Sequence, residues 1–480
     1  MALLDADQNQ GVIRVMVVRD PTIPPTTLLK QDVIIVSYPF VMSRHRKKVR
    51  YLEKIADMKK TGGQGILPER PNLCFFSEIF EPKNNGPKSP YIILDEVNAV
   101  KNSRSLTFAA VLELRKQCDV CLMLTGSPID NTWPDIFSFL QFVEGHDIRN
   151  KTMMMKLLAT QNLKYPGRYK PPQGQNFLKF IQILNHFIVR RPESIINLPP
   201  LHKHIFKFEL NLSEELTSNA TFDIYQKAIN IKAKEGKGKG QKRGTAFKSL
   251  RLALQEACHP NLVSLMAHLR REEQKDQIDE EDDVLYDAES IKEWETWRER
   301  LKENSNWQSS RINALIDVFN KQRDLDPKCS VIIFDESVYF LDIVQIAFES
   351  MYEPVESLRY DGRVPAEKRG STLTDFREAE GAKVLLMSRA AGGVGLNIAW
   401  ANVVIQCSPW WKAEWEVQAM KRAWRPGAQR PVTHITLLAE NCKAEHYKAK
   451  ARDRKHRFNT KVMDVITRDD DHRPDVWDDF

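Results

Sequence analysis

Residues 391–432 read AGGVGLNIAWANVVIQCSPWWKAEWEVQAMKRAWRPGAQRPV, and this stretch decides the fold. It follows residues 384–387, a short and wholly apolar run that is typical of a parallel strand buried on both faces. Gly392, Gly393 and Gly395 come directly afterwards, at the strand's carboxyl end, where open α/β sheets bind ligands. Because glycine has no side chain, the backbone here can approach a ligand closely or adopt a positive φ.

A second buried strand and a helix are predicted after the glycines. Residues 403–405 form the strand, and residues 412–424 form the helix. Gln418, Arg422 and Arg425 are spaced at i, i+4 and i+7, which places them on one helical face. Arginine is always charged and its planar fork matches phosphate oxygens, so these arginines suit an arginine-finger role. Taken alone they indicate a solvated basic face, but the preceding glycine turn favours the phosphate role.

These residues give the segment a specific resemblance. It resembles motifs V and VI of the Swi/Snf-type (Snf-two-like) ATPases of helicase superfamily two, typically AGGVGLNL, DPWWNP and QAxxRxxRxGQ. Two places depart from that pattern. Lys412 and Ala413 stand in place of the family's Asn-Pro, and Ala428 occupies the glutamine position of motif VI, with Gln429 one place later.

A pair of acids follows another apolar strand. Residues 91–94 run directly into Asp95 and Glu96, where an aspartate can hold magnesium and the next acid can activate water. The surrounding ILDEVNAVKN resembles the family's motif II, ILDEAHxIKN, and residues 124–131, LTGSPIDN, resemble motif III. Asn98 stands where the family has histidine. Asparagine cannot carry a charge, so the family's coupling of the ATP site to DNA is in doubt here.

The resemblance covers roughly residues 12–450, but one motif is missing. It continues at residues 190–191, 198–200, 258–260, 331–337 and 360–370. No GxGKT-type phosphate loop occurs, and residues 236–244, GKGKGQKRG, lack its spacing. The first lobe would then lack an inner strand, so we expect unpaired backbone and exposed apolar surface. Either more sequence precedes residue 1 or this lobe is an eroded remnant.

Alternating strand and helix signals predict an α/β fold with parallel sheets. The resemblance implies two RecA-like lobes, the first incomplete, joined by a helical and partly irregular region. The predicted strands are residues 13–18, 33–36, 91–94, 120–124, 331–334, 384–387, 403–405 and 435–438. The predicted domains are a partial first lobe (1–145), a helical protrusion and linker with disordered basic and acidic segments (146–310), a helicase C-terminal lobe (311–460) and an acidic tail (461–480).

Composition is consistent with a large intracellular protein. The 480 residues are 42% hydrophobic and can bury more than one core, and no apolar run reaches membrane-spanning length. The net charge of +7 permits nucleic acid binding without requiring it. Cys118 and Cys121 are better explained as strand cysteines than as zinc ligands, because no second pair follows. The tryptophans around Trp410 favour lobe packing over base stacking, and the acidic tail favours a solvated segment over a partner-binding peptide.

The resemblance implies a nuclear ATPase that translocates along double-stranded DNA or nucleosomes, in chromatin remodelling or DNA repair. Binding would be mainly to phosphates, and protein partners are expected too. In such an enzyme Asp95 holds magnesium and Glu96 acts on water, while ATP contacts the second lobe. The residues implied there are Arg422 and Arg425 for the phosphoryl charge, Gln418 as nucleotide sensor, and Gly393, Gly395 and Asn397 for coupling to lobe closure.

Three functions remain open on the sequence. The first is an active ATPase whose sequence is incomplete, and the second is a non-catalytic DNA- or protein-binding relative. The third is an α/β interaction protein in which the motifs only pack, which the ordered motifs disfavour. The missing phosphate loop predicts little ATP hydrolysis by these 480 residues.

Overall fold

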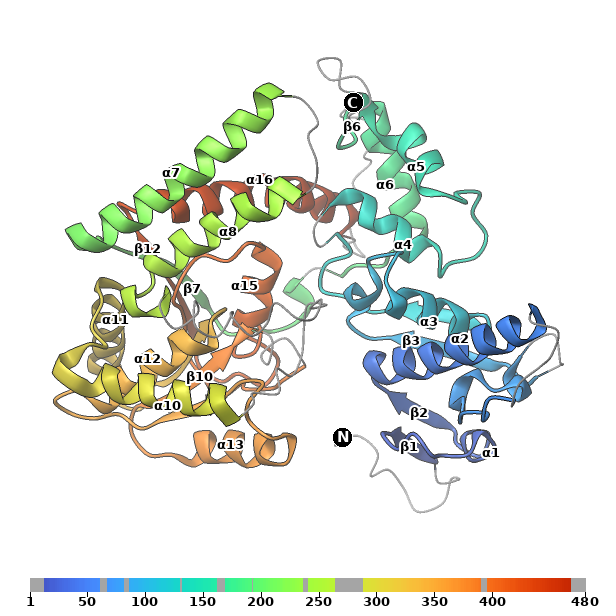
Figure 1. Cartoon of the computed structure of the whole chain (residues 1–480), viewed down its shortest axis with the longest axis horizontal. Helices are drawn as coiled ribbons and strands as arrows, with labels where there is room; N and C mark the ends of the chain where they lie inside the picture. The colour runs from blue at the N-terminus through green and yellow to red at the C-terminus, as the bar shows by residue number, and fades with distance from the viewer. Residues whose placement is uncertain are drawn as a thin grey trace. The chain divides into compact units, whose positions relative to one another are not determined.

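The computed structural model describes most of the chain, as two compact units. The described residues are 13–60, 67–81, 86–129, 132–161, 169–191, 193–235, 241–263, 288–389 and 395–467. The first unit holds those up to Arg190 together with Val462–Thr467, and the second runs from Arg191 to Lys461 (Figure 1). Every strand pairing in the larger sheet is parallel and helices alternate with its strands, so the predicted α/β class is confirmed.

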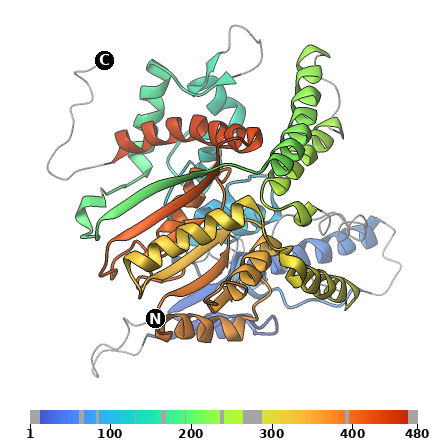
Figure 2. The ribbon, with the colours of Figure 1, turned by 90° about the vertical axis from the view of Figure 1, so that its left-hand side faces the viewer.

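The second unit is built on one six-stranded sheet. Its order is β7-β12-β11-β8-β10-β9, and Figure 2 shows β7, in green, at the edge beside β12. The strands are β7 (Leu201–Phe208), β8 (Ser330–Asp335), β9 (Ser357–Tyr360), β10 (Lys383–Ser388), β11 (Val403–Gln406) and β12 (Val432–Ala439). The four strands predicted for this lobe are confirmed, whereas β7 and β9, one at each edge, were missed. β7 was missed because its basic and aromatic residues do not form an apolar run.

Helices cover both faces of this sheet because adjacent strand residues point in opposite directions. On β8, Val331 and Ile333 pack in one core with α11 and α12, and Ile332 and Phe334 pack in the other with α13 and α15. The helices of the unit are α7 (Leu212–Glu235), α8 (Gln241–Glu256), α10 (Ala288–Lys302), α11 (Ser310–Leu325), α12 (Val338–Glu349), α13 (Ala366–Glu378), α15 (Ala413–Met420) and α16 (Lys443–Ile466), of which residues 462–466 belong to the first unit.

The first unit has no comparable sheet among its described residues. β1 (Val15–Val18) pairs in parallel with β2 (Val33–Val36), and β3 (Ser89–Leu94) pairs separately with β4 (Cys118–Met123). The short strands β5 (Thr160–Gln161) and β6 (Tyr169–Lys170) form a third pair. The helices are α1 (Pro25–Leu28), α2 (Tyr38–Lys60), α3 (Leu106–Arg115), α4 (Ile136–Leu140), α5 (Lys151–Leu158) and α6 (Gln175–Phe187). All four strands predicted for this lobe are present.

Two of the three strand pairs in the first unit, β1–β2 and β3–β4, expose apolar residues. On β3, Tyr91 and Ile93 are each 61% exposed, and their partners Val120 and Leu122 on β4 are exposed as well. On β1 the alternate residues Val15 and Val17 are exposed, and on β2 three consecutive residues, 33–35, are exposed. The expected exposure of apolar surface in the first lobe is therefore confirmed for the described residues.

Some predicted features lie wholly or partly outside the described residues. These are Gly392 and Gly393, the acidic run at 272–283, most of the acidic tail, and residues 236–240 of the basic segment. The remaining part of that basic segment, residues 241–244, is the start of α8 and so is helical, not disordered. None of the described helices is both long enough and apolar enough to span a bilayer.

A buried aspartate at the end of β8 should make the second unit more stable at acidic pH. Asp335 is 2% exposed, its Oδ1 accepts from the Ser337 N–H, and burial raises its pKa to about 7. A raised pKa means that the native state binds a proton that the unfolded state has lost, so stability falls as pH rises through 7. Between pH 6 and 8 the contribution of Asp335 to the free energy of unfolding should fall by about 1.4 kcal/mol. His259 and His434, whose pKa values burial lowers to about 4, contribute in the opposite direction over this window.

This dependence can be assigned with Asp335→Asn, which keeps the acceptor for Ser337 and cannot ionise. Urea unfolding at pH 6 and 8 should show that the change in the free energy of unfolding differs between parent and variant by about 1.4 kcal/mol, with the parent chain less favoured at pH 8. An equal loss in both proteins would place the titration elsewhere.

Candidate functional site

The predicted acids form a turn directly after β3. Asp95 is exposed, its Oδ1 accepts from the backbone N–H of Glu96, and its carbonyl accepts from the Tyr38 hydroxyl at 2.8 Å. Burial, followed by the nearby charge of Asp95, raises the pKa of Tyr38 well above its usual value, so this hydroxyl stays protonated and keeps donating. Tyr38 was missed because it lies on α2, 57 residues before Asp95.

Glu96 has an uncommon backbone conformation. Its φ and ψ are 48° and 54°, in the left-handed region that non-glycine residues rarely adopt. The 3-10 helix Val97–Val100 begins directly after it. Such strain costs about 1–3 kcal/mol and persists only where the surroundings hold it, and it occurs often at functional sites. The strain at Glu96 therefore points to a function of this turn rather than to packing alone.

Asn98 connects the turn to the segment that resembles motif III. Its Nδ2 donates to Thr125 Oγ1 at 3.0 Å and to the Ser127 carbonyl at 3.3 Å. Next to it, the Val97 N–H donates to the Leu124 carbonyl. Asparagine thus ties the two segments together without a charge at this position.

In the second unit, the segment after the glycine turn is hydrogen-bonded to the segment that carries the arginines. Arg425 Nη1 donates to the Leu396 carbonyl at 2.7 Å, and the Ile398 N–H donates to the Arg422 carbonyl at 3.0 Å. Gly395 has a φ of +34°, and Asn397 Oδ1 accepts from the Ala399 N–H. The segments predicted to act as motifs V and VI therefore contact each other directly.

The predicted helix is shorter than expected, which corrects the placement of the arginines. α15 ends at Met420, so Gln418 lies on it whereas Arg422 and Arg425 follow in turns. Pro426 disfavours helical backbone at the residue before it, and Gly427, with a φ of +96°, redirects the chain. The three residues are therefore close in sequence, but they do not share one helical face.

The tryptophans pack as predicted. Trp410 is 1% exposed and meets Phe334 edge-on. Trp415, partly buried against the same core, contacts two cations: Arg389 Cζ is 3.9 Å and Lys412 Nζ is 4.4 Å from the ring centroid. This arrangement gives Lys412, which replaces the family's asparagine, a contact of its own. Arg389 was missed because nothing in the sequence links it to Trp415.

The residues that would hold magnesium and those that would hold the phosphates of ATP are not equally represented in this chain. Magnesium prefers oxygen ligands, and the exposed Asp95 carboxylate after β3 suits it. The phosphates of ATP also need a cradle of backbone donors with a lysine, and no such loop exists in this sequence. Asp95 can thus supply one oxygen ligand, but no cluster of three or more metal-ligating side chains occurs among the described residues, and the sequence does not complete a phosphate site.

Comparisons with known proteins agree on one family. The SNF2-related domain matches residues 10–262, and the helicase conserved C-terminal domain matches residues 310–427. Relatives include an uncharacterized ATP-dependent helicase of Mycoplasma genitalium, 27% identical over 74% of this chain and 29% of its own length. The ATP-dependent helicase FUN30 of Saccharomyces cerevisiae is 26% identical over 73% of this chain and 33% of its own length.

A relative from DNA repair matches to a similar extent. The DNA repair and recombination protein RAD54 of Saccharomyces cerevisiae is 23% identical over 71% of this chain and 36% of its own length. The chain thus spans about a third of the length of these relatives. Because the SNF2-related model alone covers more than half of the 480 residues, the chain belongs to the SNF2-related, or Swi/Snf, family, and a helicase C-terminal domain follows in the same chain.

Proposed function

We propose that this chain is a DNA-binding member of the Swi/Snf family whose ATP hydrolysis is impaired. One contrast carries the proposal. The second unit has a six-stranded sheet, and the two segments predicted to meet the nucleotide are hydrogen-bonded together. The first unit has two separate strand pairs with exposed apolar faces, and the sequence has no phosphate loop.

The proposed domains follow the sequence prediction: a partial first lobe at 1–145, a protrusion and linker at 146–310, a helicase C-terminal lobe at 311–460 and an acidic tail. Within them, Asp95 would hold magnesium and Glu96 would orient water. The second-lobe residues would meet the nucleotide: Arg422, Arg425, Gln418, Gly393, Gly395 and Asn397. Family membership and the strained turn at Glu96 support these roles.

The proposed partner is double-stranded DNA, free or in nucleosomes, and the proposed location is the nucleus. Similarity to the DNA repair and recombination protein RAD54 of Saccharomyces cerevisiae supports a role on DNA. The basic excess of +7 supports contact with phosphates rather than with base edges. The chain would then act in chromatin remodelling or DNA repair by holding DNA or a protein partner.

DNA binding by the purified chain should be strongly salt-dependent and almost independent of sequence. A protein that neutralises several phosphates releases counterions, so log K falls linearly with log salt. Fluorescence anisotropy with a labelled duplex at 50, 100 and 200 mM KCl should show affinity falling by about tenfold or more across that range. A duplex of the same length and scrambled sequence is the matched control. An affinity unaffected by salt, or confined to one of the duplexes, would refute the phosphate-contact proposal.

A further inference from the structure

The second unit contains a recess at the amino edge of its sheet, away from the carboxyl end of β10 where the predicted nucleotide residues begin. Its volume is about 820 Å³. Lys328 and Ser330 enter it from the start of β8, and Lys383 from the start of β10. The residues just before β11 and β12 line it as well. Because all of these strands are parallel, their starts meet at one edge.

The recess is basic. Four cationic side chains line it and Glu380 is the one acid in the lining; the cations are Lys328, Arg377, Lys383 and Arg430. Two of them have local partners. Arg430 pairs with Asp326 at 2.8 Å, and Lys383 Nζ donates to the carbonyls of Arg377 and Ala379. Burial, followed by the charge of Arg430, lowers the pKa of Lys383, as expected in a positive environment.

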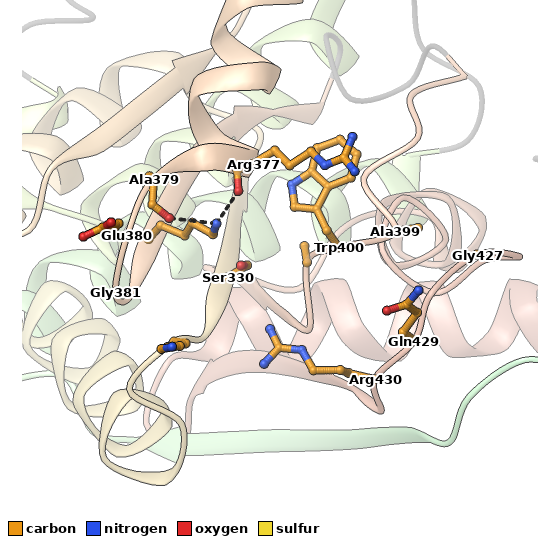
Figure 3. A pocket seen from close by; sticks show the side chains of 13 residues that line it. Ser330, Arg377, Ala379, Glu380, Gly381, Ala399, Trp400, Gly427, Gln429 and Arg430 are labelled. Atoms are coloured by element: carbon orange, nitrogen blue, oxygen red, sulfur yellow. Dashed lines mark hydrogen bonds between the residues drawn. The ribbon is translucent and has the colours of Figure 1, made fainter. Parts of the chain in front are cut away.

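Further hydrogen-bond donors accompany the cations. Trp400 Nε1 is buried without a hydrogen-bond partner among the described residues, and Gln429 contributes an amide. Arg377 lies over the Trp400 ring, 5.6 Å from its centroid. In Figure 3 these two residues stand together on one side, with Gln429 and Arg430 across from them. Because the Trp400 N–H is closed to solvent, the donors that a ligand in the recess can reach are the Gln429 amide and the cationic side chains.

We propose that this recess binds a ligand with clustered phosphate groups, either a free polyphosphate or the phosphodiester end of a nucleic acid. Guanidinium and ammonium groups at several sides of one cavity match closely spaced negative charges. An acidic peptide fits less well, because apart from the partly buried Trp400 the apolar lining consists of alanines, Ala379, Ala399 and Ala401, and gives a peptide side chain no large anchor pocket.

Two walls of the recess are continuous in sequence with the segments that are predicted to meet the nucleotide. Ala399–Ala401 continue the segment whose Leu396 carbonyl accepts from Arg425, and Gly427 follows two residues after that arginine. A Cβ added at Gly427 would lie 3.9 Å from that of Ala399, so the two walls touch. The binding site itself does not depend on ATP hydrolysis or on the proposed function.

The experiment is titration of the full chain with inorganic tripolyphosphate, followed by tryptophan fluorescence and calorimetry. Binding should change the fluorescence, and Trp400→Phe should remove most of that change. Lys328→Glu should weaken binding about tenfold or more, because it replaces a cation in the recess by an anion. The matched control is Lys368→Glu, an exposed lysine on α13 outside the recess, which should leave binding within about twofold.

Two further ligands separate the sources. One outcome is that tripolyphosphate does not bind, while Lys328→Glu weakens duplex DNA binding and Lys368→Glu does not. The ligand is then the phosphodiester end, and the proposal stands. If Lys328→Glu loses tripolyphosphate binding but keeps its affinity for DNA, the ligand is a free polyphosphate instead. The proposal is overturned if Lys328→Glu affects neither ligand, or if a hexaglutamate peptide binds with this sensitivity while tripolyphosphate does not.

Discussion

Purified residues 1–480, supplied with ATP, magnesium and duplex DNA, are expected to release phosphate no faster than the Glu96→Gln variant. A phosphoryl-transfer site works by positioning and by charge stabilisation, and both begin with a loop that cradles the β- and γ-phosphates. This sequence contains no such loop. Arg422 and Arg425 cannot replace it, since an arginine acts on a phosphate that is already held. The rate should therefore be at least about a thousandfold below that of an intact family member.

The measurement is phosphate release with and without DNA, beside an active Swi/Snf-family ATPase as a positive control. Glu96→Gln is the matched variant, because it keeps the size of the side chain and removes only the charge that could act on water. DNA-stimulated hydrolysis that Glu96→Gln abolishes would show that the site is complete in another way. The proposal of impaired hydrolysis would then be wrong, whereas the fold and family would stand.

The buried strands of the second lobe could be predicted because composition alone marks them. β8, β10 and β11 are uninterrupted apolar runs, and a strand covered on both faces needs no alternation. β7 was not predicted because it carries His202, Lys203 and His204 on a largely exposed edge of the sheet, where polar side chains remain in water. Its place beside β12, more than 200 residues later, is a long-range pairing that no local pattern encodes.

The candidate site was only partly predictable for a similar reason. The acids and the arginines carry recognisable local spacing, so their identities could be proposed from sequence. Their surroundings could not, because Tyr38 reaches Asp95 across 57 residues and Arg425 reaches Leu396 across 29. The left-handed Glu96 has no sequence signal at all, since propensity assigns that conformation to glycine or asparagine.

Arg311→Met should destabilise the second unit by about 3–5 kcal/mol, the range found when one partner of a buried ion pair is removed. Arg311 is fully buried and pairs with Glu445, which is 1% exposed. Its guanidinium also donates to the carbonyls of Ala257 and Cys407, joining the helical region, the end of β11 and α16. Methionine fills much of the volume but leaves the Glu445 charge and two carbonyls without that donor.

Urea unfolding followed by tryptophan fluorescence reports on this unit, because eight of the ten tryptophans lie between Trp294 and Trp424. The matched control is Lys443→Ala, on the helix α16 that also carries Glu445. It removes an exposed ion pair with Asp223 and should cost less than about 1 kcal/mol. If both variants lose the same small amount, Arg311 does not hold these elements together. A large loss confined to Arg311→Met would show that the second lobe depends on this buried guanidinium, on which three distant segments converge, far more than on an exposed ion pair.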